Sequence, residues 1–385
     1  NPMMFECGIK DEDLVKLYNC FDVLLHTCLS EDTKVLTDSG IKTYKELTKN
    51  DYVFGLDTDG NIVLQKIEDI YIYDYDGEMI EIKNKQLSQC VTPNHRVYYK
   101  DQRKRPRVKY ARDIYGLSRL YIPITGAWDG IDEPYIELPA FKKRGPERVL
   151  EKVRTEDFME LLGWYISEGN IRKEKGCVND NQIIISNCNE QYLKEIEELV
   201  KRLGFKPIIF NRTTARQVIF HSIQLAKLLK EAGTNSKEKH IPKKYLSYSP
   251  KYLKCLYDAL IKGDGSRAGH HVTYYTSSKQ LAEDFVELCL KLGFGVKVRQ
   301  EKVPKRKLRG QVLPETSRYV IHIHEKYHSG TVKKHHFRKV KYKGKIWCLK
   351  TATGNFFIVR DGLLSLTGNS YREGFGICMY ESMAC

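Results

Sequence analysis

Two different spacings of apolar residues divide the chain into regions of different structure. Between Cys28 and His95, short runs of alternating apolar and polar residues are separated by turns at Asp38-Ser39-Gly40, Asp59-Gly60 and Asp76-Gly77. Alternation with a period of two is typical of β strands that bury one face. From about residue 150 to residue 330, apolar residues instead recur every three or four positions. This spacing predicts helices that alternate with strands.

The region from 150 to 330 contains the same pattern twice. The first copy opens with a predicted helix at Thr155, which has two acids in its first turn, and ends at Ser167-Glu168-Gly169. The second copy opens at Ser249-Pro250, a favoured helix start, and ends at Gly263-Asp264-Gly265. A strand, a helix and the tripeptide Leu-Gly-Phe follow in both copies. The repeat predicts two similar α+β halves.

The two ends of the chain each stop inside a predicted element. Residues 8–27 are predicted to form an acid-rich amphipathic helix and a buried strand, and residues 370–385 a glycine-rich turn that enters a helix. Joined from Thr27 to Ser370, they resemble the sugar-nucleotide domain of retaining glycosyltransferases with two stacked Rossmann-like domains. In that family two Glu residues, here Glu373 and Glu381, face the nucleotide sugar. The alternative is that the two ends are unrelated tails.

Composition and charge narrow the class of protein. A chain of 385 residues exceeds one ordinary core, which predicts two or three domains. No run approaches the roughly eighteen apolar residues that span a bilayer, and the first residues lack a signal peptide. We therefore expect a cytoplasmic protein without membrane contact. The 11 Cys residues contain no CxxC pair, so we expect free thiols. The net charge of +15 suggests a polyanionic partner such as nucleic acid, although a basic surface can also serve solubility alone.

Residues that can exchange peptide bonds stand near both ends of the patterned region. They are Cys28, Thr92, His95, Cys348, Asn369 and Ser370. With the segment Gly354-Asn355-Phe356, they resemble the terminal blocks of inteins. The splicing domain of that family is an all-β horseshoe, which is shared with hedgehog autoprocessing domains.

Splicing chemistry explains why these residue types are needed. Exchange of peptide bonds without ATP requires a nucleophile beside each scissile bond. The Cys28 thiol would attack the carbonyl of Thr27 and form a thioester, while Thr92 would hydrogen-bond the oxyanion. His95 is expected to protonate the leaving nitrogen, because the charge of histidine changes near neutral pH. The Ser370 hydroxyl would then take the acyl group, and Asn369 would cyclise, with no cofactor.

Two positions depart from the usual intein pattern. Relatives usually carry His before the terminal Asn and before the Asn-Phe pair, where this chain has Gly368 and Gly354. Cyclisation of Asn369 is therefore expected to be slower, or to be helped by other groups such as His95 or solvent. Cys348 stands where many inteins have Asp. It either transfers a proton or is a packed core residue.

The repeated helices have a second resemblance. Segments 161–169 and 257–265 resemble the paired motifs of LAGLIDADG homing endonucleases, which are often embedded in inteins. Small residues at Gly163 and Ala259 would let the helices pack about a pseudo-two-fold axis and bring Glu168 and Asp264 together. Two such carboxylates suit Mg²⁺, which activates water for phosphodiester hydrolysis. Lys239 matches a family lysine that assists at the cut, or it is a solvated surface residue.

The strands beside these helix ends are predicted to form a saddle on double-stranded DNA, because a two-stranded ribbon fits the major groove. Candidate base contacts are Arg212, Arg216, Tyr274, Tyr275, Lys297 and Arg299. Basic clusters at 103–105, 142–144 and 305–307 are expected to contact phosphates or to be solvated loops. The resemblance implies a long site at the host gene without the insert, spanning the codons for Thr27 and Ser370. We expect a monomer.

These patterns together predict a multidomain chain. Host fragments are expected at 1–27 and 370–385, an all-β horseshoe splicing domain at 28–125 and 336–369, a linker or DNA-contacting segment at 126–149, and a pseudo-two-fold α+β LAGLIDADG endonuclease at 150–335. The predicted function is self-splicing combined with Mg²⁺-dependent, site-specific cleavage of DNA. Two alternatives remain open. One is a splicing element whose insert binds DNA without cutting it, against which the retained Glu168 and Asp264 argue. The other is a glycosyltransferase with a permanent regulatory insertion.

Overall fold

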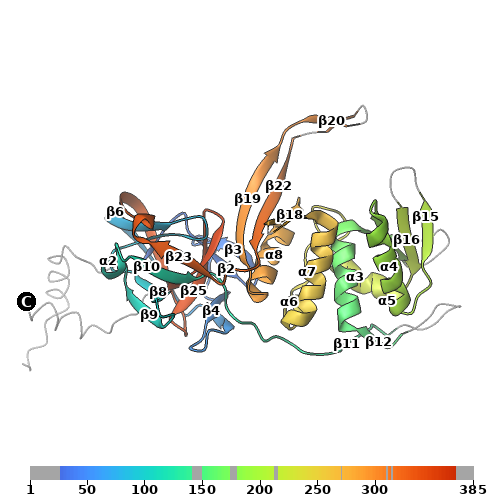
Figure 1. Cartoon of the computed structure of the whole chain (residues 1–385), viewed down its shortest axis with the longest axis horizontal. Coiled ribbons are helices and arrows are strands. Elements are labelled where there is room, and N and C mark those ends of the chain that lie inside the picture. The colour runs from blue at the N-terminus through green and yellow to red at the C-terminus, as the bar shows by residue number, and fades with distance from the viewer. Residues whose placement is uncertain are drawn as a thin grey trace, which may run out of the picture.

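The computed structural model describes residues 27–140, 150–173, 180–211, 216–269, 271–308, 311–313 and 315–369. These residues form two units that lie end to end (Figure 1). A β-rich unit is built from the two ends of the described chain, and a mixed unit of helices and strands is built from its middle. Within the described ranges, every helix is too short or too polar to cross a membrane.

The β-rich unit takes its strands from two stretches of the chain that are far apart in sequence. Its elements are β1 (Leu29–Ser30), β2 (Lys34–Thr37), β3 (Gly40–Thr43), β4 (Tyr52–Leu56), β5 (Ile62–Lys66), β6 (Asp69–Lys83), β7 (Ser88–Val91), β8 (Arg96–Lys100), β9 (Pro106–Tyr110), α2 (Ala111–Ile114), β10 (Arg119–Pro123), β23 (Ser329–Lys333), η2 (Lys334–His336), β24 (Phe337–Lys350), β25 (Asn355–Arg360) and β26 (Leu363–Gly368). The alternating patterns of the sequence therefore do form strands, as predicted.

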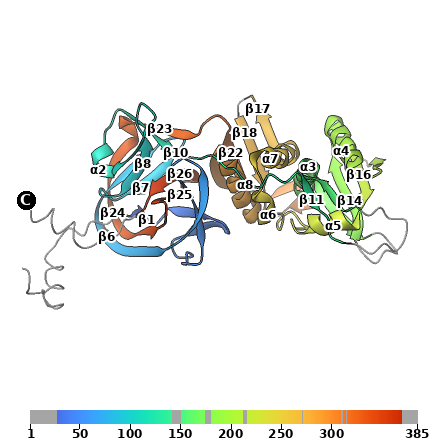
Figure 2. The same cartoon turned by 90° about the horizontal axis from the view of Figure 1, so that it is seen from below.

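Strands from both stretches close into one barrel. Its order is β1-β24-β6-β7, and β24 pairs with β6 along its whole length of 14 residues (Figure 2). A second sheet has the order β23-β10-β8-β9, so β23 belongs to this unit although the sequence division at 335 placed it in the insert. The rings of Tyr44 and Phe356 pack on Trp347, which is fully buried in the core of the unit.

The mixed unit contains the repeated pattern. Its elements are β11 (Tyr135–Glu137), β12 (Lys152–Arg154), α3 (Thr155–Glu168), β13 (Gly169–Lys173), β14 (Asp180–Asn187), α4 (Glu190–Arg202), β15 (Ile208–Asn211), β16 (Arg216–His221), α5 (Ile223–Lys230), α6 (Lys243–Leu246), α7 (Pro250–Asp264), β17 (Gly265–Ala268), β18 (His271–Thr276), α8 (Lys279–Lys291), β19 (Gly295–Val303), β20 (Arg306–Leu308), β21 (Gln311–Leu313) and β22 (Thr316–His324). The strand order β13-β14-β16-β15 of the first half recurs in the second half as β17-β18-β22-β19.

Helices α3 and α7 lie side by side at the centre of the mixed unit (Figures 1 and 2). They begin and end where the sequence predicted. A Cβ atom on Gly163 would lie 2.6 Å from Ala259 Cβ and 2.8 Å from the Leu256 carbonyl oxygen. Contacts this short leave no room for a side chain at Gly163. The glycine therefore sets how closely the two helices approach, which is the packing that the small residues predicted.

One sheet runs through both units. Its main path is β17-β18-β22-β19-β26-β25-β2-β4-β5, and it crosses between the units where β19 pairs with β26. The Val298 amide donates to the Gly362 carbonyl at 2.8 Å. Gly362 has a φ of +73°, and a Cβ there would lie 1.9 Å from the Val298 carbonyl oxygen, so this crossing requires glycine.

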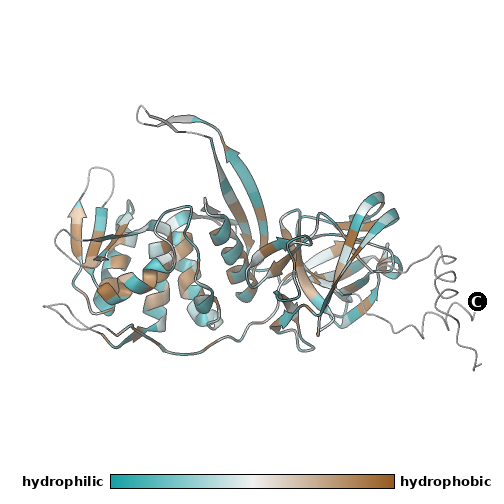
Figure 3. Cartoon of the chain, turned by 180° about the vertical axis from the view of Figure 1, so that it is seen from behind, coloured by the Kyte–Doolittle hydropathy of each residue, from teal (hydrophilic) through white to brown (hydrophobic). Residues whose placement is uncertain are grey.

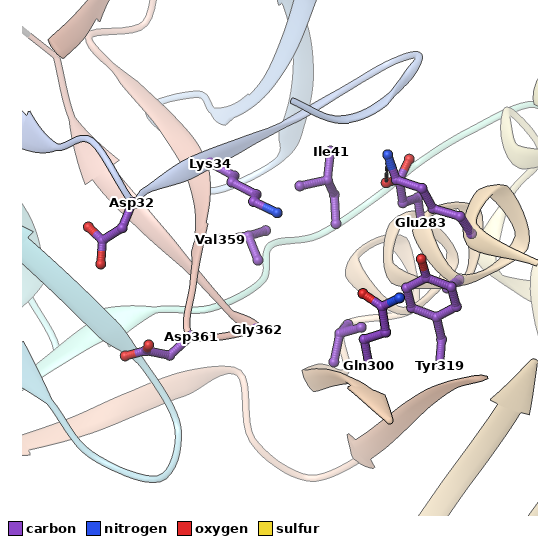
Figure 4. Close-up of a pocket in the computed structure, with 12 residues that line it drawn as sticks. Asp32, Lys34, Ile41, Glu283, Gln300, Tyr319, Val359, Asp361 and Gly362 are labelled. Carbon is purple, nitrogen blue, oxygen red and sulfur yellow. Dashed lines mark ion pairs between the residues drawn. The ribbon is translucent and has the colours of Figure 1, made fainter. Parts of the chain in front are cut away.

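A pocket of about 350 Å³ opens beside this crossing (Figure 4). Lys34 and Asp361 line it from the β-rich unit, while Glu283, Gln300 and Tyr319 line it from α8, β19 and β22. Beyond the pocket, β19 and β22 extend as an arm away from both units (Figure 1), and the arm is mostly hydrophilic (Figure 3).

The expectation of free thiols holds for the six cysteines of the described chain: Cys28, Cys90, Cys188, Cys255, Cys289 and Cys348.

Candidate functional site

The predicted nucleophile Cys28 is held between strands from both ends of the described chain. Leu29 pairs with Trp347, and this antiparallel register places Cys28 opposite Cys348. The Cys28 amide donates to Thr92 Oγ1 at 2.9 Å, and the Thr92 amide donates to the Cys28 carbonyl at 3.0 Å. Both thiols are buried, and burial together with the neighbouring Cys348 raises the pKa of Cys28 far above its usual range. The resting Cys28 is therefore a protonated thiol.

His95 lies between segments from the beginning and the end of the described chain, and it is completely buried. Its Nε2 atom is 2.7 Å from Thr367 Oγ1, and its ring also lies beside the backbone of Thr27. Burial lowers the pKa of His95 to about 4, which the Thr27 contact only partly offsets. The expectation that its charge changes near neutral pH is therefore wrong for this fold, because desolvation keeps the imidazole neutral at pH 7.

Asn369 is buried at the end of β26. Its Nδ2 donates to the Thr351 carbonyl at 3.0 Å, and its amide donates to the Gly354 carbonyl at 2.9 Å. A Cβ on Gly368 would lie 2.1 Å from the Arg96 carbonyl oxygen, and Gly354 has a φ of +73°. Both positions at which the resemblance to inteins led us to expect His therefore favour glycine here, for steric reasons at Gly368 and for backbone reasons at Gly354.

Two residues of this cluster were missed by the sequence analysis. Thr367 contacts His95, and the Thr351 carbonyl accepts from Asn369. Thr367 stands two positions before Asn369, and residues two apart on a strand share a face. That spacing could have predicted that Thr367 faces the same site as Asn369. Thr351 acts through its backbone, for which side-chain patterns carry no signal.

Several predicted residues lie outside the described chain. They are Ser370, Arg212, Glu373 and Glu381.

The two predicted metal ligands meet at the ends of α3 and α7. Glu168 and Asp264 are both half-buried, and each is the last residue of its helix. Burial, together with the Asp264 carboxylate, raises the pKa of Glu168 to about 7. Burial raises the pKa of Asp264 to about 6, although Lys239 opposes that shift. Two partly desolvated carboxylates that repel each other suit a divalent cation.

Lys239 is buried beside these acids, at 5% exposure, so the alternative of a solvated surface lysine is wrong. Its Nζ donates to the Tyr165 carbonyl at 2.6 Å and to the Gly169 carbonyl at 3.3 Å. Burial lowers the pKa of Lys239 to about 7, and Asp264 opposes that shift. A pocket of about 460 Å³ is lined by Lys239, Asp264, Tyr275 and Arg318, among others.

Tyr274 does not lie on the predicted DNA-binding face. It is fully buried, and its ring stacks on Phe285 with the centroids 4.1 Å apart. The predicted base contact of Tyr274 is therefore wrong. Adjacent strand residues point to opposite faces, so Tyr275 is the one on the open face, half-buried in the pocket beside Asp264.

The other predicted DNA contacts fall on two sheets. Lys297 pairs with His322 and Arg299 with Val320 across β19 and β22, so the two cations point to the same face as Tyr275, which pairs with Val320 from the other side. Arg299 is exposed and Lys297 is half-buried. Arg216, on β16 of the first half, is exposed and forms an ion pair with Glu190 at 2.9 Å. The predicted cations are thus divided between the two halves.

One known protein family matches both halves of the repeat. Residues 155–233 and 257–328 match the family described as LAGLIDADG-like domain. The two matched segments begin at or inside α3 and α7, so each contains one of the two acids. The mixed unit therefore contains a LAGLIDADG-like domain.

Curated relatives match a larger part of the chain. The C-terminal section of a DNA-directed RNA polymerase subunit beta from Stigeoclonium helveticum is 26% identical over 94% of this chain and 38% of its own length. An ATP-dependent Clp protease proteolytic subunit from Chlamydomonas moewusii is 24% identical over 73% of this chain and 30% of its own length. A replication factor C small subunit from Methanocaldococcus jannaschii is 26% identical over 72% and 14%. The chain thus spans between 14% and 38% of these three relatives.

Two solved structures are also similar to the chain. The homing endonuclease I-DmoI in complex with DNA and Mn is 17% identical, covers 44% of this chain and 89% of its own, and has a TM-score of 0.32. The AceL NrdHF class 3 split intein is 10% identical, covers 90% of this chain and 100% of its own, and has a TM-score of 0.31.

Proposed function

We propose that this chain is a self-splicing intein that carries a site-specific DNA endonuclease. It excises residues 28–369 and joins Thr27 to Ser370. The observation that carries the splicing part is a chain of buried contacts from Thr27 through His95 to Thr367. These contacts lead through one histidine from the first scissile junction to a residue two positions before Asn369, although the two segments stand at opposite ends of the described chain.

The first step is an acyl shift at Thr27. The Cys28 sulfur bonds to the Thr27 carbonyl carbon, and the bond from that carbon to the Cys28 nitrogen breaks. Because His95 is neutral, it first takes the thiol proton and then returns it to the leaving nitrogen. Thr92 supports this exchange by fixing the backbone of Cys28 through the 2.9 Å bond to its amide. Cys348, opposite Cys28, is the other thiol at the reacting bond.

The second junction breaks at Asn369. The Ser370 oxygen takes the acyl group from Cys28, whose sulfur regains a proton. The Asn369 Nδ2 atom then bonds to the Asn369 carbonyl carbon, and the Ser370 nitrogen leaves with a proton. The Thr351 carbonyl accepts from Nδ2 at 3.0 Å and so helps to position the side chain for cyclisation. An ester-to-amide shift finally joins Thr27 to the nitrogen of Ser370.

The nuclease function rests on the acid pair. Glu168 and Asp264 would hold Mg²⁺, which when bound activates water and stabilises the leaving oxygen of a phosphodiester. Lys239 lies in the same pocket as Asp264, and Lys297 and Arg299 present positive charge on the face that carries Tyr275. Such cations attract the DNA backbone. The proposed substrate is the host gene without the insert, around the codons for Thr27 and Ser370.

The curated relatives support an insert rather than a host activity. Their names describe an RNA polymerase, a protease and a replication factor, which share no activity. Each of these proteins nevertheless matches at least 72% of this chain over at most 38% of its own length. A sequence that recurs inside unrelated proteins is a module that they carry. This favours an excised element over a permanent regulatory domain of one glycosyltransferase.

Mass spectrometry of the expressed chain tests splicing. We expect a fragment of residues 28–369 and a joined product of the flanking segments. Cys28→Ala stops cleavage at Thr27, and Asn369→Ala stops release at Ser370, because each variant removes one nucleophile. Dithiothreitol cleaves the Asn369→Ala chain at Thr27 through the accumulated thioester.

Cys255→Ala is the matched control, because Cys255 lies on α7 of the mixed unit. It should splice like the parent chain. An intact parent chain of unchanged mass would instead support the permanent insertion, and normal ligation by Cys28→Ala would refute the scheme.

A further inference from the structure

A buried tyrosine hydroxyl in the second half of the mixed unit has no counterpart in the first half. Gly265, which follows Asp264, pairs with Tyr274 across β17 and β18. At the same point of the first half, Gly169 pairs with Ile185 across β13 and β14. Tyr274 and Ile185 are both fully buried, so the repeat packs an aliphatic side chain where the second half has a phenol. Packing alone therefore does not require the Tyr274 hydroxyl.

The Tyr274 hydroxyl is held near the acid pair and cannot turn away. Its ring stacks on Phe285 of α8, with an angle of 6° between the ring planes. Ser167 lies beside the hydroxyl, and Asp264 is near enough to influence its ionisation. Within the described chain, however, the hydroxyl makes no hydrogen bond of normal geometry. A buried hydroxyl without a partner destabilises a fold, so its presence beside the acids calls for a functional reason.

Ser167 adds a second hydroxyl of the same kind. It directly precedes Glu168 on α3, and its buried Oγ also lacks a hydrogen bond of normal geometry in the part of the chain that the structure describes. Its counterpart on α7 is Gly263, where a Cβ atom would lie 2.7 Å from Ser167 Oγ. This crossing therefore has room for one side chain. Two unpaired hydroxyls thus meet where the helix ends bring the acids together.

The Asp264 carboxylate is a suitable partner for these donors. Its pKa is raised by burial and lowered by Lys239, with no contribution from a hydrogen-bond donor in the described residues. Burial and the nearby Asp264 raise the pKa of Tyr274 well above its usual range, so the hydroxyl keeps its proton and can donate it. A carboxylate has several lone pairs, so it can accept this bond and still bind a cation.

We propose that Tyr274 is a positioning residue of the nuclease site. The Ser167 hydroxyl donates to the Tyr274 oxygen, and the Tyr274 hydroxyl donates to the Asp264 carboxylate and holds it in the orientation that binds a divalent cation. This inference rests on the proposed nuclease function. Groups that orient a metal ligand in this way typically contribute about 10–100-fold to metal affinity or activity.

Tyr274→Phe removes the hydroxyl and keeps the stacked ring. Because the lost hydroxyl is unpaired, the melting temperature of the variant without metal should be at least that of the parent. Its affinity for a divalent cation should fall about 10-fold. Calorimetric titration of Ca²⁺ into the full chain bound to a duplex of the joined host site measures this affinity.

Plasmid cutting at increasing Mg²⁺ gives a second readout. The Mg²⁺ concentration for half-maximal cutting should rise about 10-fold in Tyr274→Phe, and the rate at saturating Mg²⁺ should return to the parental value. Ser167→Ala should shift this concentration in the same direction and by less, because Ser167 acts through Tyr274. A loss of cutting that Mg²⁺ does not restore would indicate a structural role of Tyr274 and would overturn the inference.

Tyr245→Phe is the matched control, because Tyr245 is also a buried tyrosine whose hydroxyl lacks a hydrogen bond in the described part of the chain. Its ring lies 5.0 Å from that of Phe158, near the start of α3 and far from Glu168 at the other end. This variant should keep the parental cation affinity. Equal cation affinity in Tyr274→Phe and the parent would overturn the inference and leave the nuclease standing. A folded parent that binds the host site but does not cut it in Mg²⁺ would overturn the nuclease function itself.

Discussion

At the scale of single residues, Gly368 stands in a crowded position where a side chain has no room. A Cβ atom there would lie 2.1 Å from the Arg96 carbonyl, and Arg96 directly follows His95. We predict that Gly368→Ala displaces the Arg96 backbone, slows splicing strongly and destabilises the β-rich unit by about 1–3 kcal/mol through overpacking. Thermal unfolding and the yield of ligated product measure both effects.

A glycine with free space around it serves as the control for the crowding at Gly368. Gly116 has a positive φ and no heavy atom within 4 Å of its Cβ position. Gly116→Asn should therefore splice normally, because Asn tolerates this backbone region. Gly368→His should be worse than Gly368→Ala. Faster splicing by Gly368→His would show that this junction is not crowded as described.

The buried imidazole of His95 makes stability depend on pH. Its pKa is about 4 in the fold and about 6.5 when unfolded, so the unfolded chain binds more protons between these values. The stabilisation is complete above about pH 6.5 and is lost as the pH falls toward 4. We predict that lowering the pH from 7 to 5 costs the parent chain about 2 kcal/mol more than it costs a His95→Gln variant.

Urea unfolding at the two pH values measures this difference, with both chains carrying Cys28→Ala so that neither reacts. The acids of the mixed unit are common to both chains and cancel in the comparison. An equal loss of stability in both chains would mean that His95 is solvated or remains charged in the fold.

The sequence predicted site residues only where their order along the chain matched a known pattern. Cys28, Thr92, His95 and Asn369 follow a fixed order in the chain. In the structure Cys28 is hydrogen-bonded to Thr92, and His95 contacts Thr367, two positions before Asn369. The environment of a side chain was harder to predict. Tyr274 and Tyr275 are neighbours of the same type, and only the register of β18 against β22 decides which one is buried.

At the scale of elements, the contact of α3 with α7 positions both acids. We predict that Gly163→Leu pushes the helices apart, lowers the stability of the mixed unit by about 1–3 kcal/mol and abolishes Mg²⁺-dependent cutting. The reason is that its Cβ would meet Ala259 and the Leu256 carbonyl. Asp258→Ala, at a partly exposed position of α7, is the control and should cut normally. Plasmid cleavage and thermal unfolding measure the effect, and normal cutting by Gly163→Leu would contradict it.

Helix bounds were predictable and strand pairing between units was not. Ser249-Pro250 and the acids after Thr155 mark helix starts locally, so α3 and α7 begin where expected. By contrast, β23 pairs with β10, and β19 meets β26 through Gly362, across more than a hundred intervening residues in the first case. Such pairings depend on the assembled units, and no local spacing encodes them.

At the scale of the whole molecule, the two activities should be separable by mutation. Glu168→Gln or Asp264→Asn removes one proposed metal ligand, far from Cys28 and Asn369, so cutting should be lost while splicing continues. DNA binding should persist or tighten, because one negative charge near the phosphates is removed. A plasmid assay and a splicing assay on the same protein measure this. Cutting at the parental rate would exclude these acids as ligands, and lost splicing would show that the units are coupled.

The barrel that joins β6 to β24 cannot form until late in the synthesis of the chain. Residues 84–336 must be synthesised before β24 exists to pair with β6 and to hold Cys28 opposite Cys348. At about 5–20 residues per second, that takes roughly 10–50 s. During this delay the strand of Cys28 has no completed barrel around it. In the proposed function, this delay postpones self-excision until both flanking segments are about to be present in the same molecule.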